Sequence, residues 1–318
     1  MNQFVLDFEK PVVELEKQIA ELREGLREED APLAAEIEKL EKRAARLRKQ
    51  VYAKLTRWQR VQLARHPNRP YTLDYVQRML TDFVELHGDR AFGDDPAIVA
   101  GIGKLAGQPI ALIGHQKARE TKEKIRRNFG MPNPEGFRKA LRVMRMAARF
   151  QRPIVCLLDT PGAYPGIGAE ERGQAEAIAR NLFEMAHLPV PIVVVVIGEG
   201  ASGGALGIGV GDRILMMENT WYSVISPEGC AAILYRDAAN APQAAEAMRV
   251  TPTDLLELKV IDKIIKEPIG GAHNHPDEAA LILKETLIQE IATLRKLTPT
   301  RLIKLRLQKF SKMGVWSE

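Results

Sequence analysis

Glycine dominates one short segment of the chain, Gly198-Glu-Gly-Ala-Ser-Gly-Gly204. The segment follows an apolar run and precedes a helical pattern. Backbone N–H groups at the start of a helix have no intrahelical partner and favour negative charge. Gly203 and Gly204 carry no Cβ, so an electron-rich group could approach their N–H groups closely. We therefore expect an oxyanion or anion site made by the backbone; a tight strand-to-helix turn that needs glycine only for its shape is the alternative.

The same glycines match two short motifs that belong to different chemistries. Gly198, Gly200 and Gly203 spell the dinucleotide fingerprint G-x-G-x-x-G, which needs an acid about twenty residues later, and Glu218 supplies one. Gly200 and Gly204 flank Ser202 in the pattern G-x-S-x-G, the nucleophile elbow of serine hydrolases. That hypothesis requires an acid and then a histidine downstream, which are present as Asp262 with His273 or His275. Spacing alone eliminates neither interpretation.

A second glycine-rich segment, Asp159-Thr-Pro-Gly-Ala-Tyr-Pro-Gly-Ile-Gly168, also follows an apolar run. Its first residues imitate a magnesium-binding element of GTPases, but the chain contains no G-x-x-x-x-G-K-[ST] motif to hold the phosphates. Two successive strand-to-helix turns can instead form the walls of one pocket, at the strand ends where open α/β sheets bind ligands. We expect the two glycine segments to share such a pocket.

Composition narrows the class of protein. The 318 residues are 45% hydrophobic, which is enough for a large core, and the net charge is +5. Cys156 and Cys230 lie far apart without neighbouring ligand-type residues, so we predict no metal site in this chain. A reducing compartment and a cytoplasmic location fit best, because the longest apolar run is too short to span a bilayer. Basic residues gather from Lys117 to Arg127 and around Arg301, Lys304, Arg306 and Lys309, so nucleic-acid binding is a second alternative to weigh against solvated helix faces.

Hydrophobic periodicity predicts the elements that must position these turns. Apolar residues recur at steps of four and three from Leu15 to Val51, with a break before Pro32, which predicts a helical hairpin arm that needs a partner surface. Further along, apolar runs alternate with helical patterns, which predicts an α/β fold whose sheet is covered on both faces. We expect an arm over residues 1–66 and one domain over residues 67–318. The expected strands are 97–105, 109–113, 153–159, 190–197 and 213–217, and the expected helices are 135–150, 169–186, one from 202 and one or two from 277.

Four longer segments carry a family resemblance. They are Gly114-His-Gln-Lys-Ala-Arg-Glu-Thr-Lys-Glu-Lys-Ile-Arg-Arg-Asn-Phe-Gly130, Asp159-Thr-Pro-Gly-Ala-Tyr-Pro-Gly166, Gly198-Glu-Gly-Ala-Ser-Gly-Gly204 and Tyr222-Ser-Val-Ile-Ser-Pro-Glu-Gly-Cys230. In this order they resemble the alpha-subunit family of bacterial acetyl-coenzyme A carboxylase carboxyltransferases. The resemblance extends to the Leu6-Asp-Phe-Glu9 start, the segment from Arg65 to Tyr71, and Gly270-Gly-Ala-His273.

The resemblance implies a crotonase-like fold, a ββα superhelix that presents paired N–H groups to an enolate-like oxygen. It implies that Gly203 and Gly204 hold the ureido oxygen of carboxybiotin, with Gly162 and Ala163 beside them as substrate-binding residues. Lys117 and Arg119 are the candidates for contacts to coenzyme A phosphates. The implied partners are a beta subunit with a zinc ribbon, a biotin carboxyl carrier protein that holds the biotin covalently, and biotin carboxylase, in an α2β2 arrangement. The implied reaction carboxylates acetyl-CoA to malonyl-CoA for fatty acid synthesis, with no metal in this chain.

Overall fold

A computed structural model describes residues 4–25 and 30–314 of the chain. Its centre is one mixed sheet of eight strands in the order β1-β2-β3-β4-β5-β6-β8, with β7 paired to β5. The strands β1, β2 and β3 are antiparallel neighbours, whereas β3, β4, β5, β6 and β8 run parallel. The strands are β1 (Leu80–Glu85), β2 (Ile98–Leu105), β3 (Gln108–His115), β4 (Ile154–Thr160), β5 (Ile192–Ala201), β6 (Arg213–Met217), β7 (Trp221–Ser223) and β8 (Lys263–Ile265).

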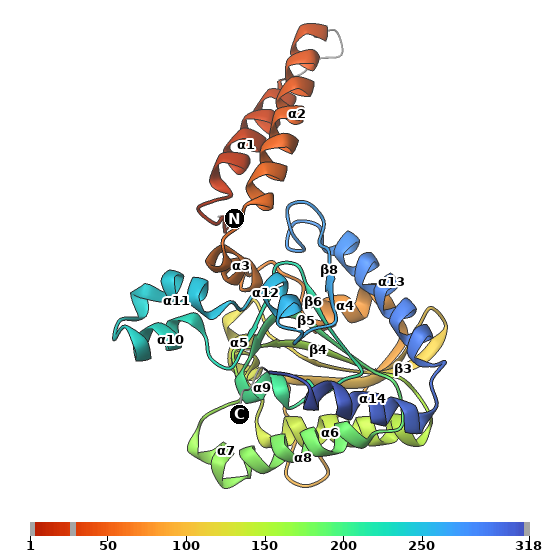
Figure 1. The fold of residues 1–318 in the computed structure, drawn as a ribbon. Coiled ribbons are helices and arrows are strands. Elements are labelled where there is room, and N and C mark those ends of the chain that lie inside the picture. The colour runs from red at the N-terminus through yellow and green to blue at the C-terminus, as the bar shows by residue number, and fades with distance from the viewer. Residues whose placement is uncertain (1–3, 26–29, 315–318) are drawn as a thin grey trace.

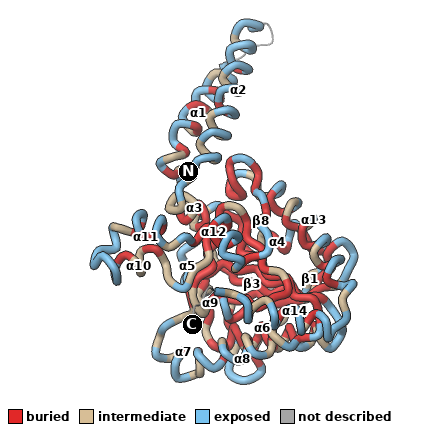
Figure 2. The backbone as a smooth tube through the Cα atoms, viewed as in Figure 1, coloured by how far each residue is buried: buried red, intermediate tan, exposed pale blue. Residues whose placement is uncertain are grey.

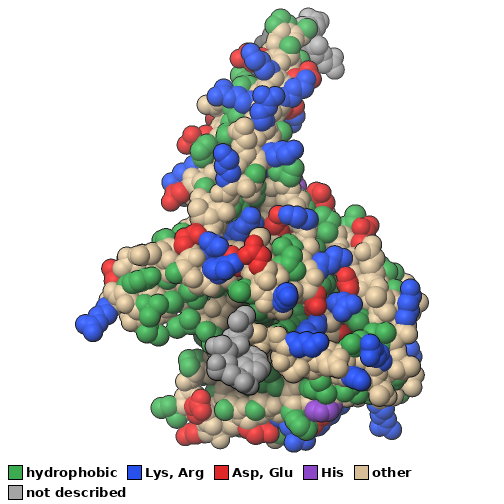
Figure 3. Space-filling view, viewed as in Figure 1, with side chains coloured by type: hydrophobic (Ala, Val, Ile, Leu, Met, Phe, Trp, Pro, Cys, Tyr) green, Lys and Arg blue, Asp and Glu red, His purple; other side chains and the backbone are tan. Residues whose placement is uncertain are grey.

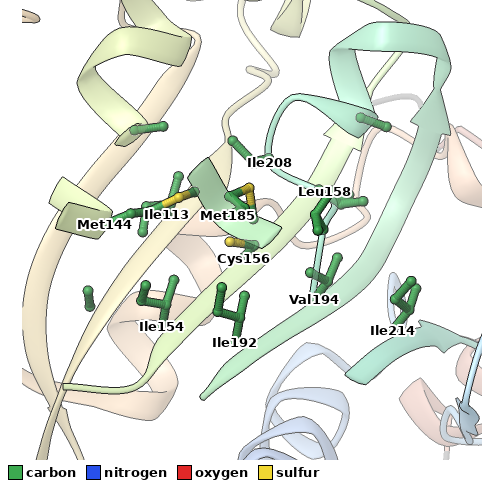
Figure 4. Close-up of a cluster of buried hydrophobic side chains, with 14 of the residues drawn as sticks. Ile113, Met144, Ile154, Cys156, Leu158, Met185, Ile192, Val194, Ile208 and Ile214 are labelled. Carbon is green, nitrogen blue, oxygen red and sulfur yellow. The ribbon is translucent and has the colours of Figure 1, made fainter. Parts of the chain in front are cut away.

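Helices cover both faces of this sheet, as the continuous apolar strands predict (Figure 1). Successive side chains of β4 and β5 alternate between two separate cores: Cys156 and Val194 belong to the first, and Val155 and Val193 to the second. The first core packs under α6 (Pro134–Arg149) and α8 (Gln174–His187), and Figure 4 shows part of it. The second packs under α4 (Thr72–Met79) and α13 (Pro276–Leu294). Buried residues concentrate around the sheet between these helices (Figure 2).

The expected strands match β2 to β6 within a few residues, and β1, β7 and β8 were not predicted. The expected helix 169–186 is wrong at its start. Gly173 adopts a left-handed φ of 82°, which ends α7 (Ile167–Glu171) and separates it from α8. The helix expected from Ser202 is only α9 (Ser202–Leu206), after which Gly207, Gly209 and Gly211 follow in quick succession. The expected C-terminal helices are α13 and α14 (Pro299–Ser311).

The N-terminal arm is a hairpin of α1 (Lys10–Glu24) and α2 (Ala31–Ala53) that projects away from the sheet (Figure 1). The apolar stripe found in the sequence is buried between the two helices, where Leu15, Ile19 and Ile37 pack together. Each helix of the hairpin therefore covers the apolar stripe of the other, and packing of the arm on another subunit stays a prediction. Lys, Arg, Asp and Glu side chains crowd the outer surface of the arm (Figure 3).

Shorter helices complete the molecule. Arg57 begins α3 and donates to the buried carboxylate of Asp254, which ties the base of the arm to the domain. None of the helices in the described ranges combines the length and the apolar composition needed to cross a bilayer. The remaining elements are α3 (Arg57–Ala64), α5 (Thr121–Arg126), η1 (Asn128–Gly130), α10 (Pro227–Leu234), η2 (Ala238–Asn240), α11 (Ala241–Met248) and α12 (Pro252–Glu257).

Candidate active site at the glycine turns

The glycine-rich segment is a strand for most of its length, not a turn. β5 continues through Ala201, so Gly198 and Gly200 are strand residues, and Gly200 pairs with Thr160 of β4 and Tyr222 of β7. A Cβ on Gly198 would lie 2.2 Å from a carboxylate oxygen of Asp159. These glycines therefore allow close approach of neighbouring groups within the sheet. The dinucleotide interpretation is wrong, because its fingerprint requires these glycines in the loop that opens the helix.

The chain turns at Ser202, whose left-handed φ of 56° swings the backbone from β5 into α9. Gly203 and Gly204 are thus first-turn residues, whose N–H groups have no carbonyl four residues back within the helix. The carbonyl of Gly203 accepts the hydrogen bond of the Gly207 N–H, which closes the single turn. These two N–H groups therefore lie at the start of a helix that directly follows a fully buried strand, which is the local geometry that the sequence predicted.

The second glycine turn lies directly against the first. A Cβ on Gly204 would come within 2.4 Å of the Gly162 carbonyl carbon and 2.5 Å of the Ala163 nitrogen. Gly162 itself has a φ of 146°, and its N–H donates to the Thr160 hydroxyl, which in turn donates to the Gly162 carbonyl. The expectation that the two turns lie side by side is confirmed. Only a residue without a Cβ at position 204 permits this contact.

His115 links the two turns, although the sequence gave it no role. It ends β3 and is fully buried. The Asp159 N–H donates to its Nδ1 (3.3 Å), so the hydrogen of the neutral ring lies on Nε2, which donates to the Gly204 carbonyl (3.1 Å). Burial lowers the pKa of His115 to about 3, so the ring stays neutral. A histidine at the end of an otherwise apolar strand was the available signal.

Lys117 lies in a buried ion-pair network rather than on a free surface. Its Nζ is 2.7 Å from Asp159 and 2.6 Å from Glu199, and Arg65 contacts the other oxygen of Glu199. Burial alone would raise the pKa of Glu199, but Lys117 and Arg65 hold it below its usual value. Burial raises the pKa of Asp159 despite Lys117. This geometry does not favour the predicted contact of Lys117 with a phosphate, because the ammonium of Lys117 already has two carboxylate partners.

A cavity of about 220 Å³ opens beside this network. Its walls combine charged groups with apolar rings, and Pro161 joins it to the turn that contains Gly162. Arg119 lies near the cavity, stacked on the Tyr71 ring with its guanidinium carbon 4.7 Å from the ring centre. The Arg119 side chain is 44% exposed and also pairs with Asp74. The residues that line the cavity are Ala64, Arg65, Pro67, Tyr71, Lys117, Ala118, Lys124, Phe129, Pro161 and Glu199.

The residues of the serine-hydrolase hypothesis are not brought together. His273 Nε2 lies 2.9 Å from Glu9, which precedes the arm, and its ring stacks on His66. Asp262 instead accepts hydrogen bonds from the Ile214 N–H and from Lys309. Asp262 and His273 are thus engaged elsewhere, and His275 lies at the N-cap of α13, in the same loop as His273, so the hypothesis is wrong. Glu218, the acid of the dinucleotide hypothesis, likewise binds Lys266.

Glu9, His66 and His273 form the one group of three metal-ligand types that lie close together in the described residues. Each comes from one of the segments outside the glycine turns that carry the family resemblance. The Asn68 N–H donates to Nδ1 of His66, and the Nε2 of His66 contacts the Phe4 carbonyl, so both ring nitrogens are engaged. Hydrogen bonds and ring contacts within this group therefore hold the segment before α1 against the loop before α13.

Four cations of the two basic segments are engaged inside the protein. Arg306 is 1% exposed and pairs with Asp212, and Lys309 binds Asp262. Lys117 is paired inside the domain, and Arg127 donates to the Pro96 carbonyl. These four cations serve the fold, whereas Lys122, Arg301 and Lys304 are exposed, so nucleic-acid binding stays an untested alternative.

Comparison with known families agrees with this geometry. The family model described as acetyl co-enzyme A carboxylase carboxyltransferase-like matches residues 5–314. The chain belongs to the acetyl-coenzyme A carboxylase carboxyltransferase alpha-subunit family. Among proteins named as this alpha subunit, that of Geobacter metallireducens is 59% identical, covering 100% of this chain and 99% of its own length. That of Geobacillus sp. is 60% identical over 97% of this chain and 95% of its own. As a member of this family, the chain is one subunit of a multi-subunit carboxyltransferase, a transferase.

Solved structures show the same fold at low sequence identity. The transcarboxylase 12S hexamer core matches with a TM-score of 0.58 and 17% identity, over 72% of this chain and 42% of that one. A Pseudomonas malonate decarboxylase hetero-dimer matches with a TM-score of 0.53 and 16% identity, over 69% of this chain and 91% of that one. The predicted crotonase-like α/β class is thus confirmed for this carboxyltransferase subunit.

Proposed function

We propose that Gly203 and Gly204 hold the ureido oxygen of carboxybiotin through their backbone N–H groups, in the transfer of its carboxyl group to acetyl-CoA to give malonyl-CoA. The observation that carries this proposal is the contact between Gly204 and the Gly162–Ala163 backbone. It joins the two turns into one site at the ends of β4 and β5. Open sheets of this kind bind ligands at such strand ends.

The residues present suit an oxygen that gains negative charge. The Cβ positions of Gly203 and Gly204 point at Ile178 and at the Gly162–Ala163 backbone, so a side chain there would disturb the protein's own packing. Ser202 and Thr160 supply no charge, and the nearby carboxylates of Asp159 and Glu199 are paired with two cations, Lys117 and Arg65. The partial positive charge of the unpaired N–H groups at the helix start favours an anion at the turn.

The chemistry of this chain is electrostatic stabilisation. When bound, carboxybiotin supplies the carboxyl group and, after its loss, a basic nitrogen for the methyl proton of acetyl-CoA. As the carboxyl group leaves, the Gly203 and Gly204 N–H groups stabilise the charge that develops on the ureido oxygen. A preorganised donor of this type contributes roughly 10²- to 10³-fold in rate. His115 keeps the carbonyl of Gly204 fixed and thereby the direction of the first turn.

The residues beside the glycine turns also suggest where coenzyme A is contacted. We assign Arg119 as the contact to a coenzyme A phosphate, because its side chain is partly exposed beside the cavity. Lys117 instead positions Asp159 and Glu199. Gly162 and Ala163 form the wall of the site opposite Gly204.

The remaining parts of the reaction belong to partners. We propose a beta subunit with a zinc ribbon, which holds the enolate of acetyl-CoA, in an α2β2 assembly. Biotin is carried by a biotin carboxyl carrier protein, after carboxylation by biotin carboxylase, and not by this chain. We place this assembly in the cytoplasm, where it supplies malonyl-CoA for fatty acid synthesis.

The experiment is a comparison of Gly203→Val with Ser202→Ala in the complex with the beta subunit. Biotin-dependent decarboxylation of malonyl-CoA, the reverse reaction, is measured for both, with circular dichroism as the check of folding. The proposal predicts that Gly203→Val loses the activity while Ser202→Ala retains it within about threefold. Full activity of a folded Gly203→Val complex would overturn the oxyanion assignment.

A further inference from the structure

Phe129 has a backbone conformation that bulky residues rarely adopt. Its φ is 55° and its ψ is 23°, and the flanking Asn128 and Gly130 are also left-handed, with φ of 46° and 80°. Glycine and asparagine tolerate this region, whereas the Cβ of a phenylalanine crowds the backbone there. Residues held in such conformations persist only where the surroundings over-determine them, and they concentrate at functional sites.

The turn around Phe129 is fastened on both sides. The Gly130 N–H donates to the Arg127 carbonyl (2.8 Å), and the Met131 N–H donates to the Asn128 carbonyl (2.9 Å). The Asn128 side chain adds a bond to the Met131 carbonyl (2.9 Å). Gly130 packs so closely on the stem of Lys117 that a Cβ would lie 2.7 Å from its Cγ. The residues around Phe129 therefore fix its conformation, and the contact of Gly130 with Lys117 fixes the position of the turn relative to the ion-pair network.

The ring of Phe129 has no part in the hydrophobic cores. Phe129 is 52% exposed, so burial of its ring does not offset the unfavourable backbone conformation. The residue lines the cavity beside the glycine turns, together with Tyr71 and Pro161. Of the charged groups that line the cavity, Lys117, Glu199 and Arg65 are already engaged in ion pairs with one another, with Asp159 and with Glu228. On the side of Phe129, the cavity therefore offers an incoming molecule a flat apolar ring beside the ammonium of Lys124.

We propose that Phe129 is a specificity-determining residue, whose ring stacks on the uncharged fused-ring system of the donor substrate in the cavity beside Gly162. The inference rests on the proposed function, because that function brings such a ring to this site. The ureido ring of that fused system is planar, so a flat aromatic face packs against it and excludes a strongly hydrated group. The strained turn fixes the ring in place before the substrate arrives, which lowers the entropy cost of binding.

The test uses the complex of this chain with its beta subunit and free biotin as the varied substrate in malonyl-CoA decarboxylation. Phe129→Ala is expected to raise the KM for biotin about fivefold to tenfold, with kcat within about twofold. Phe129→Tyr keeps the aromatic face and restores the wild-type KM. Phe129→Leu keeps apolar bulk without the face and provides the same test if the alanine variant does not fold.

The matched control is Phe150→Ala. Phe150 is also an exposed phenylalanine, but it follows the far end of the sixteen-residue helix α6, roughly 24 Å along the axis from Pro134. Its replacement is expected to leave the KM unchanged. A wild-type complex without activity overturns the proposed function and this inference with it. An active wild type whose KM is unchanged by Phe129→Ala overturns this inference alone, and so does a variant that only weakens association with the beta subunit.

Discussion

Replacement of Gly204 by alanine tests the contact that holds the two glycine turns together. The new methyl group would lie 2.4 Å from the Gly162 carbonyl carbon, about 1 Å short of the 3.4 Å at which ordinary contact begins. Backbone stands on both sides of this contact, so one turn must move by about that distance. A displacement of roughly 1 Å in a positioned group costs about 10²-fold in rate, which corresponds to about 2.7 kcal/mol in the activation barrier. We expect kcat to fall by about 10²-fold.

The fold of the Gly204→Ala variant should survive, because alanine is favoured over glycine within a helix by up to about 1 kcal/mol, which partly offsets the strain. The assay is biotin-dependent decarboxylation of malonyl-CoA in the assembled complex, with thermal unfolding as the check of stability. Gly93→Ala is the matched control, since a Cβ there meets nothing within 4 Å. Activity of Gly204→Ala within threefold of wild type, at an unchanged unfolding midpoint, would refute the reasoning.

Three further predictions concern the groups around the turns. His115→Phe removes the hydrogen bonds to Gly204 and from Asp159, so it should lower the free energy of unfolding by about 1–3 kcal/mol. The same change should reduce kcat more than it changes KM. The activity of the wild type should show no titration of this histidine between pH 5 and 8, because burial lowers its pKa to about 3. Lys117→Met leaves buried Asp159 without a cation and buried Glu199 with Arg65 alone, so it should cost about 3–5 kcal/mol in urea unfolding, and a further Glu199→Gln change should recover part of the loss. Burial would raise the pKa of Glu267, but Arg69 lowers it to about 2, so its contribution of about 3 kcal/mol is present above pH 4.5 and lost as the pH falls toward 2. Glu267→Gln should therefore flatten the acid limb of the stability curve, and an unchanged limb would contradict that assignment.

Much of the fold could be predicted from periodicity. The buried strands of the sheet are continuous apolar runs. The bounds of β6 were predicted as observed, because Arg213 and the residues after Met217 mark its two ends. The strands β7 and β8 have only three residues each, too few to show a period. The break between α7 and α8 depends on the left-handed Gly173, and the φ of a single glycine cannot be predicted from the sequence.

The candidate site could likewise be predicted only in part. Glycines at a strand-to-helix junction predict N–H groups without an intrahelical partner from local geometry alone, and Gly203 and Gly204 follow that rule. Long-range partners do not follow from local pattern. Lys117 lies in a basic run in sequence, yet its partners Asp159 and Glu199 come from the ends of β4 and β5, and only the parallel pairing of those strands brings them together. The short motifs at Gly198 and Ser202 misled for the same reason, since they ignore where the strand ends.

The measurement that tests the central claim most directly is malonyl-CoA decarboxylation with biotin, by this chain alone, by the beta subunit alone and by their mixture. If the backbone N–H groups of Gly203 and Gly204 complete a site shared with the partner, only the mixture is active, and its activity falls about 10²-fold with Gly204→Ala. A verified, stable complex without activity, or full activity of the beta subunit alone, would contradict the account.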